Sequence, residues 1–320
     1  MNQNQEKISL KYLFDTSPYK DCDVICTGLS GSEKAYFVNR LYMKHRAPVV
    51  VVTSSTKEAE ICLEDLEFFT ERPSPPPIYF PPYNITPFKY LSYHNETAAK
   101  RIRSLYQLIV GDVPPMVVTT ISALMQRILP KQELCDYAEL VMIEEDIDRD
   151  RLVDKLISSG YDRSSMVEEP GDFSIRGGIF DIFSPLYSDP IRIELFGDTV
   201  ESIRFFSAVT QRTIKNIPEV VILPARETIL KSDHLTPIIN RIRKQSSKLD
   251  IPVTKVRDLI HRIRRERVFP GIESLITLIY PNPDSFFDYV PKNTFFILNE
   301  PAELENIADH TLLQASKSFD

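Results

Sequence analysis

The first 130 residues alternate short apolar runs with segments whose apolar residues recur at helical spacing. The apolar runs predict strands at residues 23–27, 49–53, 78–80 and 116–120. Residues 49–53 are a near-continuous β-branched run, which suits a strand buried on both faces of a parallel sheet. The segments between the runs predict helices up to residue 44 and over residues 57–69, 98–109 and 121–129. This alternation predicts an α/β layer fold with right-handed crossovers.

After Pro130 the pattern changes to short strands punctuated by glycine. Four of the nine glycines fall within residues 171–197, so the turns there are specified one by one. The runs between them predict strands at residues 173–176, 179–183, 191–196 and 200–206, with Gly197-Asp198 as a two-residue hairpin turn. With one helix near residues 150–158, the region from 131 to 223 is predicted to be a small, mostly antiparallel α+β domain.

Helix and strand signals return from about residue 224. Apolar stripes predict helices around residues 235–242 and 256–263, and residues 294–298 read as a late strand. The tail beyond about Ala302 shows little core-forming character. The predicted division is therefore 1–130, 131–223 and 224–320.

The strand at residues 191–196 has two chemically different faces. Alternation places three aliphatic side chains on one face, Ile191, Ile193 and Leu195. The other face carries Arg192, Glu194 and Phe196. Arginine, glutamate and an aromatic together are typical of a docking surface. The alternative is a solvated sheet face on which a neighbouring helix covers the aromatic ring.

Composition removes several classes of function. The net charge of −7 argues against a nucleic-acid footprint over the whole chain. No apolar stretch approaches the ~20 residues that cross a bilayer, and the polar start predicts no signal peptide, so we expect a cytoplasmic protein without membrane contact. The four cysteines form no CxxC pair and the five histidines are scattered, so neither a metal nor a catalytic site is predicted. Cys26 and Cys62 are expected to be buried thiols.

The sequence GLSGSEKA, residues 28–35, resembles a phosphate-binding loop with two defects. A Walker A loop requires G-x-x-x-x-G-K-[ST], and Gly28 and Lys34 fit that frame. Glu33 stands where glycine amides would wrap the phosphate and adds a negative charge there. Ala35 lacks the hydroxyl that would ligate Mg²⁺. We expect a degenerate loop that binds no nucleotide.

Two further segments have open interpretations. Residues 241–267 hold ten Lys/Arg against three Asp/Glu, which fits the solvated side of two amphipathic helices and, less well, a DNA contact. Residues 79–95 hold six aromatics but only one lysine, so they are expected to cap a core rather than stack on bases.

Several segments together resemble the amino-terminal module of transcription-repair coupling factors. The runs VEEPGDFSIRGGIFDIF and PIRIELFGDTVESIRFF are similar to the domain that these factors share with the excision-repair protein UvrB. TQRT at residues 210–213 and LPARE at residues 223–227 are closer to the coupling factors. Residues 119–130 and 269–298 resemble the flanking parts, so the likeness covers most of the chain.

The resemblance implies a non-catalytic adaptor that recruits the repair protein UvrA to RNA polymerase stalled at DNA damage. It implies a parallel-sheet, P-loop-like α/β domain interrupted by the small domain, whose Arg176, Arg192 and Phe196 match UvrA-binding positions. RNA polymerase and DNA contacts, and the ATP and Mg²⁺ of a translocase motor, would belong to downstream domains. The carboxy-terminal region of the full protein would mask the small domain, so a self-masking role stays open. The remaining alternative, a UvrB-like damage-binding ATPase, lacks support because the phosphate loop is defective and residues 79–95 are too short for UvrB's long hairpin.

Overall fold

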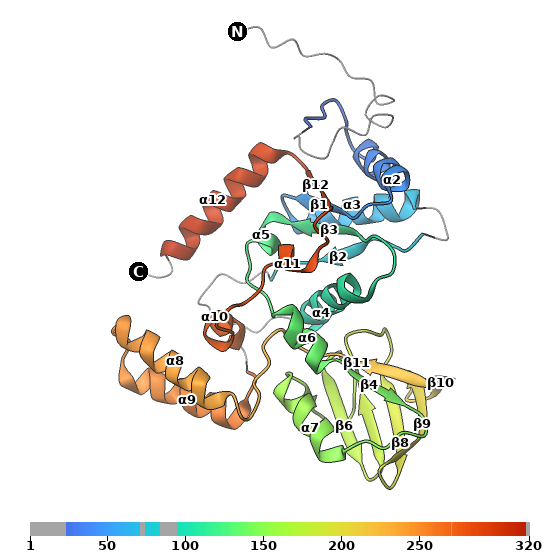
Figure 1. The fold of residues 1–320 in the computed structure, drawn as a ribbon, viewed down its shortest axis with the longest axis vertical. Helices are drawn as coiled ribbons and strands as arrows, with labels where there is room; N and C mark the ends of the chain where they lie inside the picture. Colours follow the sequence, from blue (N-terminus) through green and yellow to red (C-terminus); the bar gives the residue numbers. More distant parts are fainter. Residues whose placement is uncertain (1–23, 71–73, 84–94, 270, 318–320) are drawn as a thin grey trace.

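The computed structural model describes residues 24–70, 74–83, 95–269 and 271–317 (Figure 1). Its first layer is a four-stranded, all-parallel sheet in the order β12-β1-β3-β2. The strands are β1 (Val49–Thr53), β2 (Ile78–Phe80), β3 (Met116–Thr120) and β12 (Phe295–Leu298). The predicted α/β class is therefore correct, and a strand from the last thirty residues completes the sheet next to β1.

Helices cover both faces of this sheet because its strands are apolar on both sides. They are α2 (Glu33–His45), α3 (Thr56–Phe69) and α4 (Asn95–Val110). Val49 and Val51 pack with α2 and α3, whereas Val50 and Val52 share a core with α4. The period-2 alternation along β1 thus separates two hydrophobic cores.

The second core extends into the later helices of the chain. These are α8 (Leu235–Lys248), α9 (Val253–Glu266), η1 (Ile272–Leu275), α10 (Ile276–Ile279), α11 (Phe286–Tyr289) and α12 (Pro301–Lys317). They join two short helices that follow β3, α5 (Ile121–Leu124) and α6 (Lys131–Tyr137). Ile128, Ile242 and Phe286 belong to one buried cluster. The regions before and after the small domain therefore share one sheet and one core.

The small domain is built on a six-stranded sheet in the order β10-β9-β8-β7-β6-β5. Its strands are β5 (Asp162–Arg163), β6 (Asp172–Arg176), β7 (Ile179–Ile182), β8 (Ile191–Phe196), β9 (Thr199–Phe206) and β10 (Thr213–Asn216). All neighbours pair antiparallel except β5 and β6. A short ribbon of β4 (Glu139–Met142) and β11 (Glu219–Ile222) and the helix α7 (Arg149–Ser158) cover one face. The mostly antiparallel α+β character was predicted correctly.

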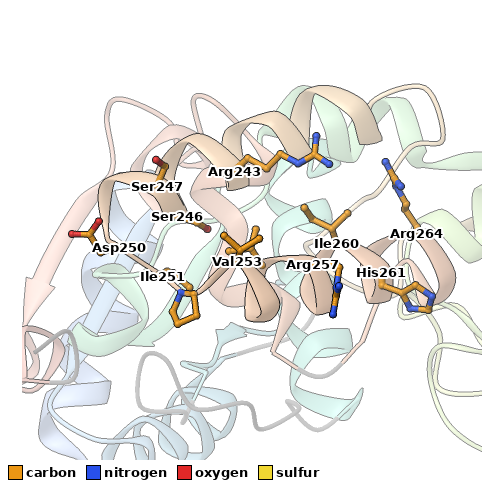
Figure 2. A pocket seen from close by; sticks show the side chains of 12 residues that line it. Arg243, Ser246, Ser247, Asp250, Ile251, Val253, Arg257, Ile260, His261 and Arg264 are labelled. Carbon is orange, nitrogen blue, oxygen red and sulfur yellow. The ribbon is translucent and has the colours of Figure 1, made fainter.

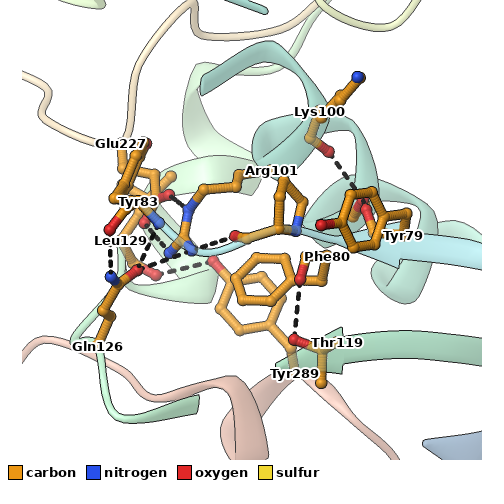
Figure 3. A network of polar contacts seen from close by, with 12 residues as sticks. Tyr79, Phe80, Tyr83, Lys100, Arg101, Thr119, Gln126, Leu129, Glu227 and Tyr289 are labelled. Carbon is orange, nitrogen blue, oxygen red and sulfur yellow. Dashed lines mark hydrogen bonds and ion pairs between the residues drawn. The ribbon is translucent and has the colours of Figure 1, made fainter. Parts of the chain in front are cut away.

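A buried ionic cluster fastens the segment that leaves the small domain to the α/β layer (Figure 3). Arg101 on α4 is fully buried and forms an ion pair with Glu227, which is also buried. Its guanidinium also donates to the carbonyl of Pro81 at 2.8 Å and to Gln126 at 3.0 Å, and lies 4.3 Å from the ring centroid of Phe80. Since a buried charge needs a partner and further hydrogen bonds, this cluster fixes where the small domain attaches.

Arg226, next to Glu227, makes a second connection. Its guanidinium donates to Glu273 at 3.1 Å and to Asn95 at 2.8 Å. Burial raises the pKa of the Glu273 carboxyl, and the charge of Arg226 opposes that rise. The LPARE motif at residues 223–227 thus supplies both arginine and glutamate to the junction.

Three expectations about local structure are corrected. Residues 24–27 form no strand, and Cys26 is exposed, because β12 occupies the free edge of β1 and leaves this short run without a ladder partner. The helix predicted over residues 121–129 stops at Leu124. The tail beyond Ala302 has little core-forming character, as predicted: it forms α12, which begins with proline at its first position and buries Leu304 in the core, while Leu312 and Leu313 are exposed.

The remaining expectations concern Cys62, the aromatic segment at residues 79–95 and membrane-spanning helices. Cys62 is half-buried rather than fully buried, and burial raises the pKa of its thiol to about 12. Phe80 and Tyr83 are buried, whereas residues 84–94 of the aromatic segment lie outside the described residues. Within the described part of the chain, no helix is long and apolar enough to cross a membrane.

Candidate functional site

The outer face of the small domain's sheet carries rows of polar side chains. Register places Asp181 of β7 opposite Arg192 of β8, which in turn lies opposite Arg204 of β9. Glu194 lies beside Arg192 on β8, opposite Ser202 of β9. Because side chains alternate along a strand, these groups all project from one face while Ile191 and Ile193 are buried on the other. The predicted two-faced strand is therefore correct.

Asp181 organises the first row. Its side chain is only 2% exposed, and Arg192 grips it with two hydrogen bonds, from Nε to Oδ1 at 2.6 Å and from Nη2 to Oδ2 at 2.8 Å. Arg176 at the end of β6 donates to Oδ2 at 2.6 Å. The guanidinium of Arg192 also lies 4.6 Å from the ring centroid of Phe206, and its hydrogen bonds with Asp181 raise its pKa further. Arg192 is thus partly buried, and its contacts with Asp181 and Phe206 fix the arrangement of side chains on this face.

A second ion pair lies on the neighbouring rungs. Arg204 donates from Nη1 to Oε2 of Glu194 at 2.7 Å, and the hydroxyl of Ser202 donates to the same oxygen at 2.8 Å. The hydrogen bonds from Arg204 lower the pKa of the Glu194 carboxyl to about 2, although burial opposes the change. Both charges therefore persist at physiological pH, and their cross-strand geometry is fixed.

Two side chains at one end of this face remain open to a partner. Phe196 is 81% exposed at the end of β8, directly before the Gly197-Asp198 turn. The side chain of Arg176 is 55% exposed at the end of β6. Strands β6 and β8 run in the same direction with β7 between them, which separates their backbones by about 10 Å. The register places Arg176 in the row of Ile179 and Glu194, two residues before Phe196 along β8. An exposed aromatic and a half-exposed guanidinium therefore lie near the same end of an ordered charged surface.

Glycine permits the close backbone packing behind this edge. The β6–β7 turn contains Gly177, with φ +62°, and Gly178. A Cβ on Gly178 would lie 2.6 Å from the carbonyl oxygen of Leu195, so no other residue fits without moving β8. This approach lets the backbone N–H of Leu195 donate to the carbonyl of Gly178 at 2.8 Å, so the β6–β7 turn packs directly against the end of β8.

The structure brings together all three predicted interaction residues, and it adds two that sequence reasoning missed. Asp181 is the partner of both predicted arginines, and Arg204 is the partner of Glu194. The available signal for Asp181 was a carboxylate within the apolar strand IFDI, directly after the Gly177-Gly178 turn. We refer to Arg176, Asp181, Arg192, Glu194, Phe196 and Arg204 as the polar sheet face.

The GLSGSEKA segment, residues 28–35, lies elsewhere, before and within the start of α2. The side chain of Lys34 donates to Asn299 at 2.8 Å and to Glu300 at 2.7 Å, both in the connection from β12 to α12. Glu33 accepts a hydrogen bond from the backbone N–H of Ser30 at 3.0 Å, and Ala35 is buried. Gly28 and Gly31 both have positive φ. In this arrangement the lysine that a phosphate would need is bound to two acceptors of the protein itself.

Comparison with known proteins places these features in context. Residues 141–227 match the UvrB interaction domain family, a range that contains the whole polar sheet face. Over 291 residues the chain is 31% identical to the transcription-repair-coupling factor of Myxococcus xanthus, covering 88% of this chain and 24% of that protein. The corresponding protein of Bacillus subtilis (strain 168) is 30% identical over 296 residues, 89% of this chain and 25% of its own length. The chain thus spans about a quarter of the length of these relatives.

Proposed function

Because the chain is a homologue of the transcription-repair coupling factors over the part that contains the UvrB interaction domain, we propose that it is a non-catalytic adaptor. Its polar sheet face binds the excision-repair protein UvrA and so connects stalled transcription to repair. The observation that carries this proposal is the exposed pair of Phe196 and Arg176 beside an ordered set of ion pairs. Aromatic and arginine side chains are the most frequent anchors of protein interfaces.

The ion pairs prepare this surface for binding. Arg176 uses one amino group on Asp181, and more than half of its side chain faces solvent. Arg192 and Arg204 are held bidentately, so binding costs little additional side-chain entropy on these strands. A partner with an apolar pocket and neighbouring carboxylates fits this arrangement best.

We expect Phe196→Ala to weaken binding of purified UvrA about thirtyfold, as truncation of an interface anchor costs about 2 kcal/mol. Arg176→Ala should weaken it in the same direction. Since Phe196 is 81% exposed, its removal should leave the melting temperature nearly unchanged. Biolayer interferometry with the 320-residue chain immobilised measures the affinity directly.

Phe68→Ala is the matched control for this experiment. Phe68 lies on α3 in the α/β layer and is 83% exposed, so its truncation removes a comparable surface aromatic far from the polar sheet face. If Phe196→Ala bound UvrA like the unchanged chain, or if Phe68→Ala lost as much affinity, the docking assignment would be wrong.

As a non-catalytic adaptor, this segment is expected neither to bind nor to hydrolyse ATP. Lys34 is bound by Asn299 and Glu300, Glu33 adds negative charge, and Ala35 offers no Mg²⁺ ligand. Isothermal calorimetry with millimolar Mg-ATP should therefore show no saturable heat. A stoichiometric binding heat that disappears in Lys34→Ala would contradict this expectation.

The same face is our proposed site for masking by the carboxy-terminal region of a full-length coupling factor. An exposed Phe196 next to fixed charges suits an internal partner as well as UvrA. The RNA polymerase and DNA contacts, and the ATP-driven motor, are proposed for the remaining three quarters of such a protein. Addition of the carboxy-terminal region as a separate chain should compete with UvrA for the wild-type surface.

A further inference from the structure

The helical hairpin of α8 and α9 has a groove between its two helices that the adaptor function does not use (Figure 2). The groove has a volume of about 740 Å³. Apolar side chains form its floor: Ile251, Pro252, Val253, Val256 and Ile260. Figure 2 shows Asp250 at one end of the groove and Arg264 with His261 at the other.

Two of the apolar residues that line this groove are exposed to solvent. Val253, in the first turn of α9, is 82% exposed, and Ile251 in the preceding connection is 39% exposed. Val256 and Ile260 continue the same row one and two turns along the helix, where Val256 is partly buried and Ile260 is only 7% exposed. Exposed apolar side chains at the open end of a groove, here Ile251 and Val253, are characteristic of a surface that packs against another molecule.

Arginines form the rim. Arg243 comes from α8, and Arg257 and Arg264 come from α9. Within the described part of the chain, none of these three forms an ion pair with a carboxylate. The spacing of Arg257 and Arg264 corresponds to about 10 Å along the helix axis, which is two helical turns.

Other cations of the same region have structural roles, which distinguishes them from the rim. Arg241 donates to the carbonyl oxygens of Leu278 at 2.7 Å and Ile279 at 2.8 Å. Arg262 lies 4.1 Å from the ring centroid of Phe269. The cations of residues 241–267 therefore do not all belong to a uniform solvated face. Some of them stabilise the fold, and others line the groove.

We propose that this groove binds an acidic amphipathic helix from a partner protein. The apolar residues of such a helix would pack on Ile251, Val253 and Val256, and carboxylates spaced two turns apart would pair with Arg257 and Arg264. The local positive charge stands out in a chain whose net charge is −7, so an acidic partner is favoured here. A phosphate backbone is disfavoured, because it would leave the apolar floor uncovered. This inference is independent of UvrA binding at the small domain.

The test uses the full 320-residue chain and a fluorescein-labelled 18-residue helical peptide. The peptide carries leucines on one face and glutamates two turns apart beside them, and binding is measured by fluorescence anisotropy. Saturable binding is expected, weakening as salt is raised. Val253→Asp should abolish it, and Arg257→Glu with Arg264→Glu should weaken it at least about tenfold. Circular dichroism confirms that each variant is folded.

Lys255→Glu is the matched control, since it reverses an exposed charge on α9 outside the groove lining. It should bind the peptide within about twofold of the unchanged chain. The proposal is overturned by any of three results: no saturable binding, equal binding of a peptide with the same composition in scrambled order, or equal loss in Lys255→Glu. Tighter binding of a 20-base-pair duplex than of the peptide would instead assign the groove to nucleic acid.

Discussion

Arg101→Ala is expected to lower the free energy of unfolding by about 3–5 kcal/mol, because it leaves the carboxylate of Glu227 buried without its counter-charge. The substitution also removes the donors to Pro81 and Gln126, and it removes the contacts of the guanidinium with the rings of Phe80 and Tyr83. Urea denaturation followed by circular dichroism measures the loss, with scanning calorimetry to detect separate transitions.

Lys100→Ala is the control on the same helix. Lys100 is exposed and pairs only with Glu96 among the ion pairs described, so its removal should change stability by no more than about 0.5 kcal/mol. Arg101→Met combined with Glu227→Gln removes both charges and should recover part of the stability lost in Arg101→Ala. An Arg101→Ala variant within 1 kcal/mol of the unchanged chain would show that the cluster is not a stabilising junction.

Arg192→Ala is expected to destabilise the small domain by about 2–3 kcal/mol and to lose UvrA binding as a result. Arg192 supplies two of the three hydrogen bonds that arginines donate to Asp181, whose side chain is 2% exposed. By sequence, Arg192 and Phe196 share one strand face and both match UvrA-binding positions, so their variants are expected to behave alike. The ion pair with Asp181 predicts different effects on stability instead. Phe196 contributes exposed surface area, whereas Arg192 stabilises the sheet face through its hydrogen bonds.

Melting curves of the two variants, recorded beside their UvrA affinities, distinguish these roles. Phe196→Ala should bind poorly and melt normally, whereas Arg192→Ala should bind poorly and melt early. Asp181→Asn added to Arg192→Ala removes the unpaired charge and should raise the melting temperature again. If Arg192→Ala had the same melting temperature as the unchanged chain, Arg192 would contribute to UvrA contact and not to the stability of the small domain.

The sequence predicted those features that depend on nearby residues. The β-branched run of β1, the alternation along β8 and the Gly197-Asp198 turn all follow from local periodicity and turn preference. The position of Arg192 on the polar side of its sheet followed from alternation as well. These are patterns within a few residues, and the structure places them as expected.

Partners distant in sequence were not predictable in the same way. Asp181 could be recognised only once β7 was paired with β8, and Glu227 only once α4 was packed against the segment that leaves the small domain. The failed strand at residues 24–27 has the same origin, because its place beside β1 is taken by β12. Pairing across a fold is determined by tertiary packing, which a single sequence does not display.

The pairing of Val49 with Phe295 also determines the order in which the chain can fold. The parallel sheet cannot close until nearly the whole of this segment has been synthesised, whereas β6 to β9 join neighbours through short connections. Local contacts form faster than contacts with a large loop-closure entropy. The small domain is therefore expected to fold first on the ribosome. Its docking surface would then be complete while the edge of β1 is still unpaired, because β12 has not yet been synthesised.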